Sequence, residues 1–175
     1  QMDANDAIFA GFADYFVPED RWEKAKCHLI ETGDPEFLKG LDVSLSESHL
    51  SKNLVLIEEV FSESNHEALI ERMSKYTELA SAMRRLKKAS PLSIFVTTKM
   101  LRMPEIASSV KSALETEYRY TARAQEFSDF QEGIRAMVID KDKNPNWKHL
   151  SLDSVSQDEG LWFLTPLDSK LELRL

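Results

Sequence analysis

The sequence has little cysteine, glycine or proline. Of its 175 residues, one is cysteine (Cys27), five are glycine and six are proline. A single thiol excludes a disulfide within the chain and the thiolate cage of a structural zinc site. The low glycine and proline counts exclude collagen-like and low-complexity architectures. A chain of this length usually folds as one domain, which is what we expect here.

The chain also lacks excess positive charge and long apolar runs. Its 22 basic residues stand against 30 acidic ones, which gives a net charge of −8. Nucleic-acid binding requires a cationic surface that displaces counterions, so we expect no nucleic-acid partner. No apolar run approaches the roughly 18 residues that cross a bilayer, so we expect no membrane partner either. Because Gln1 precedes Met2, we interpret the chain as a fragment; a cloning remnant and a processed terminus are the alternatives.

The usual catalytic signatures are missing as well. The sequence has no glycine-rich phosphate loop, no Gly-x-Ser-x-Gly elbow and no His-Glu-x-x-His helix. Its four histidines stand far apart in polar surroundings, and we interpret all four as surface residues: His28, His49, His66 and His149. Cys27 is interpreted as a buried or half-buried helix residue, because His28 would point about 100° away from it on a helix. Residues 115–132 mix carboxylates with Arg119 and Arg123, which favours an ion-paired, solvated face.

Helical periodicity and helix-capping residues are abundant. Pro18 predicts the start of a helix that ends at Gly33, and Asp34-Pro35 predicts a short helix to about Gly40. Further helix starts are predicted at Ser64 or Asn65, Thr77, Ser90-Pro91, Pro104, Ser128 and Ser156. The sequence therefore predicts an all-α domain, with room for one short strand over residues 13–17.

The longest helix is predicted over residues 105–127. One stripe of its side chains is expected to face the core: Ile106, Val110, Leu114, Tyr118 and Ala124. The opposite side is expected to face water: Lys111, Glu115 and Arg119.

Segments near both ends resemble one enzyme family. Toward the C-terminal end they are residues 117–119 (EYR), 129–136 (DFQEGIRA) and 139–147 (IDKDKNPNW). Residues 90–93 (SPLS) and the opening stretch with Gly11-Phe12-Ala13-Asp14 and Val17-Pro18 add to the resemblance. Together they are similar to the C-terminal region of the enoyl-CoA hydratase/isomerase (crotonase) superfamily, and most similar to its 3-hydroxyisobutyryl-CoA hydrolase branch.

This resemblance implies an activity for a longer protein, namely hydrolysis of 3-hydroxyisobutyryl-CoA in valine breakdown. In the family, a spiral core supplies the oxyanion hole and the water-activating carboxylate. That core would precede this chain, so residues 1–175 are expected to form a single C-terminal helical domain of a crotonase-type fold. The domain would hold no catalytic residue, and it would be inactive when isolated. It would pack over the core and self-associate, exposing an apolar face with Phe9, Phe12, Phe16 and Phe95 as candidates.

The resemblance also implies a binding site for the acyl-CoA substrate, and it implies no metal or redox cofactor. Family members commonly hold the 3′-phosphoadenosine end of CoA with an aromatic residue and a lysine from the C-terminal helix. By position, the aromatic falls on Met137 and the lysine on Lys141, with Lys143 as second choice. Met137 cannot stack as an aromatic would. The alternative is that Lys141 and Lys143 only balance Asp140 and Asp142 on a solvated turn.

Two other functions stay open at this point. The chain would also suit the same region of an enoyl-CoA hydratase or isomerase, although residues 140–147 favour the hydrolase branch. It would also suit a free-standing helical interaction module without catalysis. The family implies the bacterial cytoplasm or, alternatively, the mitochondrial matrix as the location.

Overall fold

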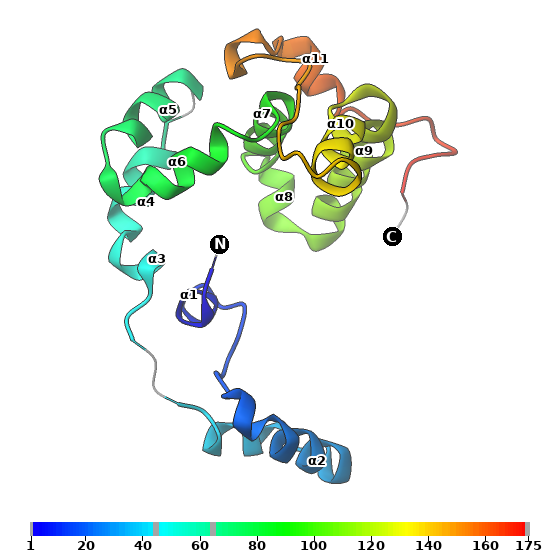
Figure 1. Cartoon of the computed structure of the whole chain (residues 1–175). Helices are drawn as coiled ribbons and strands as arrows, with labels where there is room; N and C mark the ends of the chain where they lie inside the picture. The colour runs from blue at the N-terminus through cyan, green and yellow to red at the C-terminus, as the bar shows by residue number, and fades with distance from the viewer. Residues whose placement is uncertain (1, 44–45, 64–65, 174–175) are drawn as a thin grey trace. The chain divides into compact units, whose positions relative to one another are not determined.

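The computed structural model describes residues 2–43, 46–63 and 66–173 (Figure 1). Within these ranges every regular element is helical, so the predicted all-α fold is confirmed. The chain divides into two compact units, Gln1–Ser62 and Glu63–Leu175, and each is described by itself. Whether the two act as one domain in a longer protein stays a prediction.

The N-terminal unit contains short helices joined by extended segments. They are α1 (Ala4–Phe9), η1 (Glu19–Arg21), α2 (Trp22–Thr32), η2 (Pro35–Gly40), α3 (His49–Lys52) and α4 (Leu54–Phe61). As predicted, α2 ends at Gly33, whose φ of +69° is a left-handed conformation that glycine adopts without strain. The strand predicted over residues 13–17 is wrong. The segment is extended but forms no ladder among the described residues; Val43 donates one backbone hydrogen bond to the carbonyl of Phe16 (3.3 Å).

The C-terminal unit holds the longer helices. They are α5 (His66–Ser74), η3 (Thr77–Leu79), α6 (Ala80–Leu86), α7 (Pro91–Met100), α8 (Pro104–Ser108), α9 (Val110–Phe127), α10 (Phe130–Ile134), η4 (Arg135–Ile139), η5 (Leu152–Ser154) and α11 (Gln157–Trp162). Ser90 and Ser156 cap α7 and α11 by accepting the backbone N–H three residues ahead, as predicted. The predicted caps Ser64 and Asn65 lie outside the described residues.

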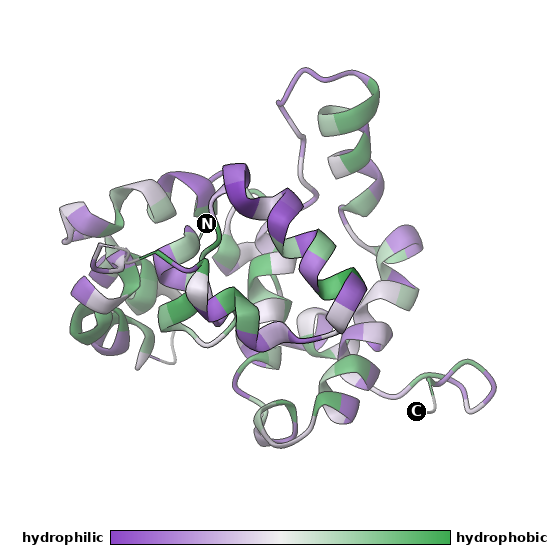
Figure 2. Cartoon of the chain, turned by 90° about the horizontal axis from the view of Figure 1, so that it is seen from below, coloured by the Kyte–Doolittle hydropathy of each residue, from purple (hydrophilic) through white to green (hydrophobic). Residues whose placement is uncertain are grey.

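The core of this unit forms where α7 packs against α11 and η5. Its buried side chains are Leu92, Phe95, Val96, Leu152, Val155, Phe163 and Leu164. Gly160 of α11 lies so close to the ring of Phe95 that an added Cβ would overlap it. The helices mix apolar and polar residues around their surfaces (Figure 2), as expected for helices that bury only one side.

The prediction for the longest helix needs two corrections. Ser109 interrupts it with an extended backbone (φ −155°, ψ 126°) and caps α9, so there are two helices, α8 and α9. The inward stripe is also wrong in part, because Val110 is 78% exposed, and Leu114 and Tyr118 are exposed as well. Ala124 is buried as predicted.

An arginine explains the orientation of α9. The Arg123 guanidinium is buried and donates hydrogen bonds to the carbonyls of Phe163 (3.2 Å), Thr165 (2.8 Å) and Pro166 (3.1 Å). It also lies over the Trp162 ring, 4.7 Å from its centroid. These contacts turn the Arg123 face of α9 inward and leave the apolar row of Val110, Leu114 and Tyr118 in water. Burial lowers the pKa of Arg123.

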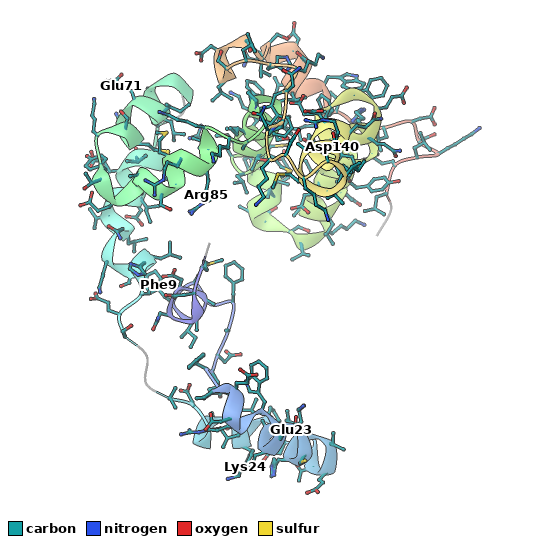
Figure 3. All side chains as sticks on the ribbon, viewed as in Figure 1. Phe9, Glu23, Lys24, Glu71, Arg85 and Asp140 are labelled. Carbon is teal, nitrogen blue, oxygen red and sulfur yellow. The ribbon has the colours of Figure 1, made fainter. Side chains whose placement is uncertain are left out.

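Three single-residue predictions are also wrong. His149 is buried (8% exposed), because its ring contacts Glu159, with Nε2 3.0 Å from Oε2. Cys27 is exposed on α2 rather than buried. Phe95 lies in the core rather than on an apolar surface, whereas Phe9 and Phe12 are exposed. Figure 3 labels Phe9 on α1.

Candidate functional site

The predicted CoA-binding residues lie on and after the turn that ends α10. There the helix continues into the π-helical turn η4, which places one extra residue in the turn. The N–H of Asp140 donates to the carbonyl of Arg135 (2.8 Å), and that of Lys143 donates to Ala136 (3.0 Å). Residues 140–147, which follow, are called the lysine loop here. Figure 3 labels Asp140 at its start.

Arg135 joins this helix to the lysine loop. Its guanidinium makes two hydrogen bonds to the Glu132 carboxylate, each 2.8 Å. It also bonds Asp140 and Asp142, each at 2.7 Å, and the carbonyl of Asn144 at 3.2 Å. A guanidinium suits this arrangement because its planar donors can bind several acceptors at once. The path of the loop is therefore fixed by one cation.

The ion pairs and hydrogen bonds of this network favour the ionised forms of the Glu132 and Asp142 carboxyl groups and of the Arg135 guanidinium. The hydrogen bonds from Arg135, and next the N–H of Asn146, lower the pKa of Glu132 from its ordinary value of 4.5 to about 2. Arg135 and the N–H of Asn144 lower the pKa of Asp142. The carboxylates in turn raise the pKa of Arg135. Glu132, Asp142 and Arg135 are thus charged at neutral pH.

The two lysines of the loop adopt an unusual backbone conformation. Lys141 has φ +57° and Lys143 has φ +56°. A left-handed conformation costs a residue other than glycine about 1–3 kcal/mol and persists only where surrounding contacts impose it. Here the Arg135 network supplies those contacts on both sides of each lysine.

The lysine ammonium groups are exposed, and no ion pair involves them in the part of the chain that the structure describes. The neighbouring carboxylates, Asp140 and Asp142, pair with Arg135. The alternative that the lysines balance these two aspartates is therefore not the arrangement observed. Strained, exposed and unpaired, Lys141 and Lys143 are chemically suited to an anion.

Met137 lies on the turn before the lysines and is 58% exposed. Val138 and Ile139 beside it are also exposed. These three side chains form an exposed apolar patch next to the two lysines, at the position where the resemblance would place an aromatic residue. A thioether and methyl groups can cover an apolar surface, but they offer no ring for stacking.

Motifs far apart in the sequence meet beside this site. Ser90, of the SPLS segment, donates a hydrogen bond to Asp129 of the DFQEGIRA segment (2.6 Å), and both side chains are buried. The indole N–H of Trp147 donates to the carbonyl of Lys88 (3.1 Å). Trp147 also packs on Gly133, where an added Cβ would lie 3.6 Å from the ring. Residues 88–90, the DFQEGIRA segment and Trp147 of the last segment thus lie side by side in the C-terminal unit.

Sequence reasoning missed Arg135 as the organiser of this loop. The signal was present, because three carboxylates surround a single arginine within eleven residues, at 132, 140 and 142. Helical spacing suggests only the Glu132 pair. Among residues 2–43, 46–63 and 66–173, no group of three or more His, Cys, Asp or Glu side chains could hold a metal ion. No helix within these ranges is long and apolar enough to cross a membrane.

The profile of the enoyl-CoA hydratase/isomerase family matches residues 1–163. The 3-hydroxyisobutyryl-CoA hydrolase of Dictyostelium discoideum, named as mitochondrial, is 29% identical over 99% of this chain and 49% of its own length. A probable 3-hydroxyisobutyryl-CoA hydrolase of Arabidopsis thaliana is 30% identical over 89% of this chain and 45% of its length. The chain spans about half the length of the curated relatives it matches.

Solved structures give the same result. An enoyl-CoA hydratase from Rhodobacter sphaeroides superposes with a TM-score of 0.86 at 34% identity, over 99% of this chain and 50% of that one. A carnitinyl-CoA dehydratase from Mycobacterium thermoresistibile superposes with the same TM-score at 25% identity, over 97% and 49% of the two chains. The helical fold seen here is therefore part of a crotonase-type fold. The chain belongs to the enoyl-CoA hydratase/isomerase family.

Proposed function

We propose that this chain is the C-terminal helical part of a 3-hydroxyisobutyryl-CoA hydrolase. The complete enzyme would add water to the thioester carbonyl and release the free hydroxy acid and CoA. The observation that carries the proposal is the family match over residues 1–163, together with relatives named as this hydrolase. Their identities of 29% and 30% support the branch without fixing the acyl group.

The catalytic groups would come from the rest of the enzyme. An oxyanion hole lowers the barrier because its donors bind the negative charge that develops on the thioester oxygen. This chain would pack over that core and contribute to subunit contacts. The exposed row of Val110, Leu114 and Tyr118 on α9 supports such a covered face, because exposed apolar patches mark interaction surfaces. The isolated chain is expected to be inactive and to self-associate.

The chain's own part in substrate binding would be the lysine loop. Lys141, with Lys143 beside it, would hold the 3′-phosphate of CoA as a point-charge partner, and Met137 would lie against the adjoining apolar surface. Arg135 would act as a positioning residue that keeps both lysines in place. Relatives named as mitochondrial favour the mitochondrial matrix, the alternative location above, over the bacterial cytoplasm.

A second function is supported by one observation. The enoyl-CoA hydratase from Rhodobacter sphaeroides is 34% identical, a higher identity than that of the named hydrolases. In that case the complete enzyme would add water across a carbon–carbon double bond. A free-standing helical module is the third possibility, and an in-frame crotonase core upstream of Gln1 in the coding sequence would exclude it.

The test uses the complete protein and two assays side by side. Release of CoA from 3-hydroxyisobutyryl-CoA is measured against loss of enoyl absorbance with an enoyl-CoA. The hydrolase proposal predicts CoA release and little hydration; efficient hydration without CoA release would overturn it. Lys141→Ala should raise KM by the equivalent of about 1–2 kcal/mol and leave kcat nearly unchanged, because the phosphate contact is equal in ground and transition states. Lys170→Ala, another exposed lysine, is the matched control.

A further inference from the structure

An aliphatic cavity lies in the C-terminal unit, away from the lysine loop. Its volume is about 220 Å³, it is open to solvent on one side, and residues of α5, α6, α7 and the segment around η5 line it. Most of its lining is aliphatic, with Ile70, Met83, Leu86, Ile94 and Leu152 as the main contributors. The cavity shares no residue with the CoA site proposed above.

A cationic surface begins at the rim of this cavity. Lys87 lines the cavity and also a neighbouring hollow of about 440 Å³, whose other charged residues are Arg84, Arg85 and Lys88. These four cations are called the basic segment. Arg85 donates to the Ser81 hydroxyl at 3.0 Å, and Figure 3 labels it in α6. The aliphatic cavity and the positively charged surface thus meet at Lys87.

The charge of the basic segment is uncompensated. Within residues 2–43, 46–63 and 66–173 none of its four cations forms an ion pair with a carboxylate, whereas Lys75, Lys148 and Arg135, for example, each do. This is unusual in a chain with a net charge of −8. Four unpaired cations in five consecutive residues attract anions and repel cations.

Leu150 extends the apolar surface at the mouth of the cavity. Its side chain is 94% exposed although its neighbours His149 and Leu152 are buried. The buried residues on either side fix the backbone here, so the Leu150 side chain lies in solvent beside the opening of the cavity. A ligand that entered the cavity would cover it.

We propose that this cavity binds an aliphatic anion, a plain hydrocarbon chain whose anionic head lies against Lys87 and the basic segment. An apolar cavity of roughly 150 Å³ accepts benzene, so one of this size has room for a chain of about six to eight carbons. The lining offers one side-chain hydroxyl, on Ser151, and no aromatic ring. A nucleotide base or a sugar would leave several polar atoms unpaired there, whereas a hydrocarbon chain leaves none.

The head group is specified by charge and position. Because Lys87 lines both spaces, the anion must lie directly next to the hydrocarbon chain, as it does in a free aliphatic carboxylate or an alkyl phosphate. In an acyl-CoA a long linker separates the acyl chain from the phosphates, so an acyl-CoA would not match this layout.

The first experiment is a calorimetric titration of the 175-residue chain with butanoate, hexanoate and octanoate at low ionic strength. Each buried methylene should tighten binding about fourfold, so octanoate should bind roughly tenfold or more tightly than hexanoate. Octyl phosphate tests the alternative anionic head, and octylammonium tests the charge requirement. No saturable binding, no dependence on chain length, or equal binding of octylammonium would overturn the proposal.

Two exposed positions allow variants that leave the fold intact. Leu150→Asp and Lys87→Glu should each weaken octanoate binding about fivefold or more, the first by placing a like charge at the mouth and the second by removing the cation. Leu171→Asp and Lys170→Glu make the same changes at exposed positions outside the cavity and should leave binding unchanged. Equal weakening by a control and its matched variant would contradict the assignment. Melting temperatures close to that of the unchanged chain would verify that each variant is folded.

Discussion

Different interactions stabilise the interior of each of the two units of the chain. The C-terminal unit contains a cluster of large buried side chains, including Leu92, Phe95 and Phe163. In the N-terminal unit fewer described residues are buried, namely Ala25, Leu41 and Val60 with the polar Asp6 and Ser48. There the Asp6 carboxylate accepts hydrogen bonds from the Ser48 hydroxyl (2.8 Å) and the Leu50 N–H (3.0 Å). Apolar burial therefore stabilises the C-terminal unit, and polar contacts between distant segments contribute more to the N-terminal unit.

This difference matters for function because the lysine loop and the aliphatic cavity both belong to the unit with the apolar core. Apolar burial scales with area and supplies most of the stability of a folded domain. A binding loop built on such a core can hold strained residues, as it does at Lys141 and Lys143. The N-terminal unit, with few large buried side chains, is expected to gain more from contacts elsewhere in a complete protein.

The largest expected effect comes from opening a hole in the C-terminal core. Leu92 is fully buried, and Leu92→Ala should lower the free energy of unfolding of that unit by about 2–5 kcal/mol. Urea denaturation followed by tryptophan fluorescence measures it, because Trp147 and Trp162 lie in the C-terminal unit and Trp22 in the other. Leu101→Ala, an exposed position at the end of α7, should change it by less than about 0.5 kcal/mol. A small effect at Leu92 would show that this core is not the source of stability.

A second, smaller effect should follow from overfilling the same core. Gly160→Ala would place a methyl group against the Phe95 ring and should cost about 1–3 kcal/mol of unfolding free energy. Gly40→Ala is the matched control in the N-terminal unit, because its Cβ would meet nothing within 4 Å. Thermal unfolding of both variants compares the two units directly. If Gly160→Ala lowered the melting temperature of the chain no more than Gly40→Ala does, tight packing between α7 and α11 would be contradicted.

The smallest effect concerns acid and the N-terminal unit. The Leu50 N–H, and then the Ser48 hydroxyl and the Asp3 N–H, lower the pKa of Asp6 below its ordinary value of 3.8. Its stabilisation is therefore complete above about pH 3.8 and is lost as the pH falls through the lowered value. Asp6→Asn should reduce stability at neutral pH and flatten this acid dependence. Amide exchange at Leu50, measured between pH 5 and 2.5, checks it, and an unchanged pH profile in the variant would refute it.

Local sequence signals predicted much of the fold. Gly33, Ser90 and Ser156 end or begin helices where their side chains or backbone freedom predict it, because capping depends on a few adjacent residues. The inward face of α9 could not be predicted, because Arg123 is turned inward by carbonyls some forty residues away. Burial of His149 depends in the same way on Glu159.

For the candidate site, the family resemblance indicates which residues to consider but not how the backbone holds them. Lys141, Lys143 and Met137 were chosen from a family resemblance, and they stay predictions as CoA contacts. The left-handed backbone at both lysines follows from how Arg135 spans Glu132, Asp140 and Asp142, a geometry that spacing alone does not give.

The most direct test of the lysine loop as a phosphate site compares CoA with 3′-dephospho-CoA, which lacks only the 3′-phosphate. NMR titration of the 175-residue chain at low ionic strength should show CoA binding about fivefold or more tightly, with the largest shifts at residues 140–147. The Lys141→Ala/Lys143→Ala double variant should bind the two ligands equally, whereas Lys170→Ala should keep the difference. Equal affinities of the unchanged chain for CoA and 3′-dephospho-CoA would contradict a role for the lysine loop in binding the 3′-phosphate.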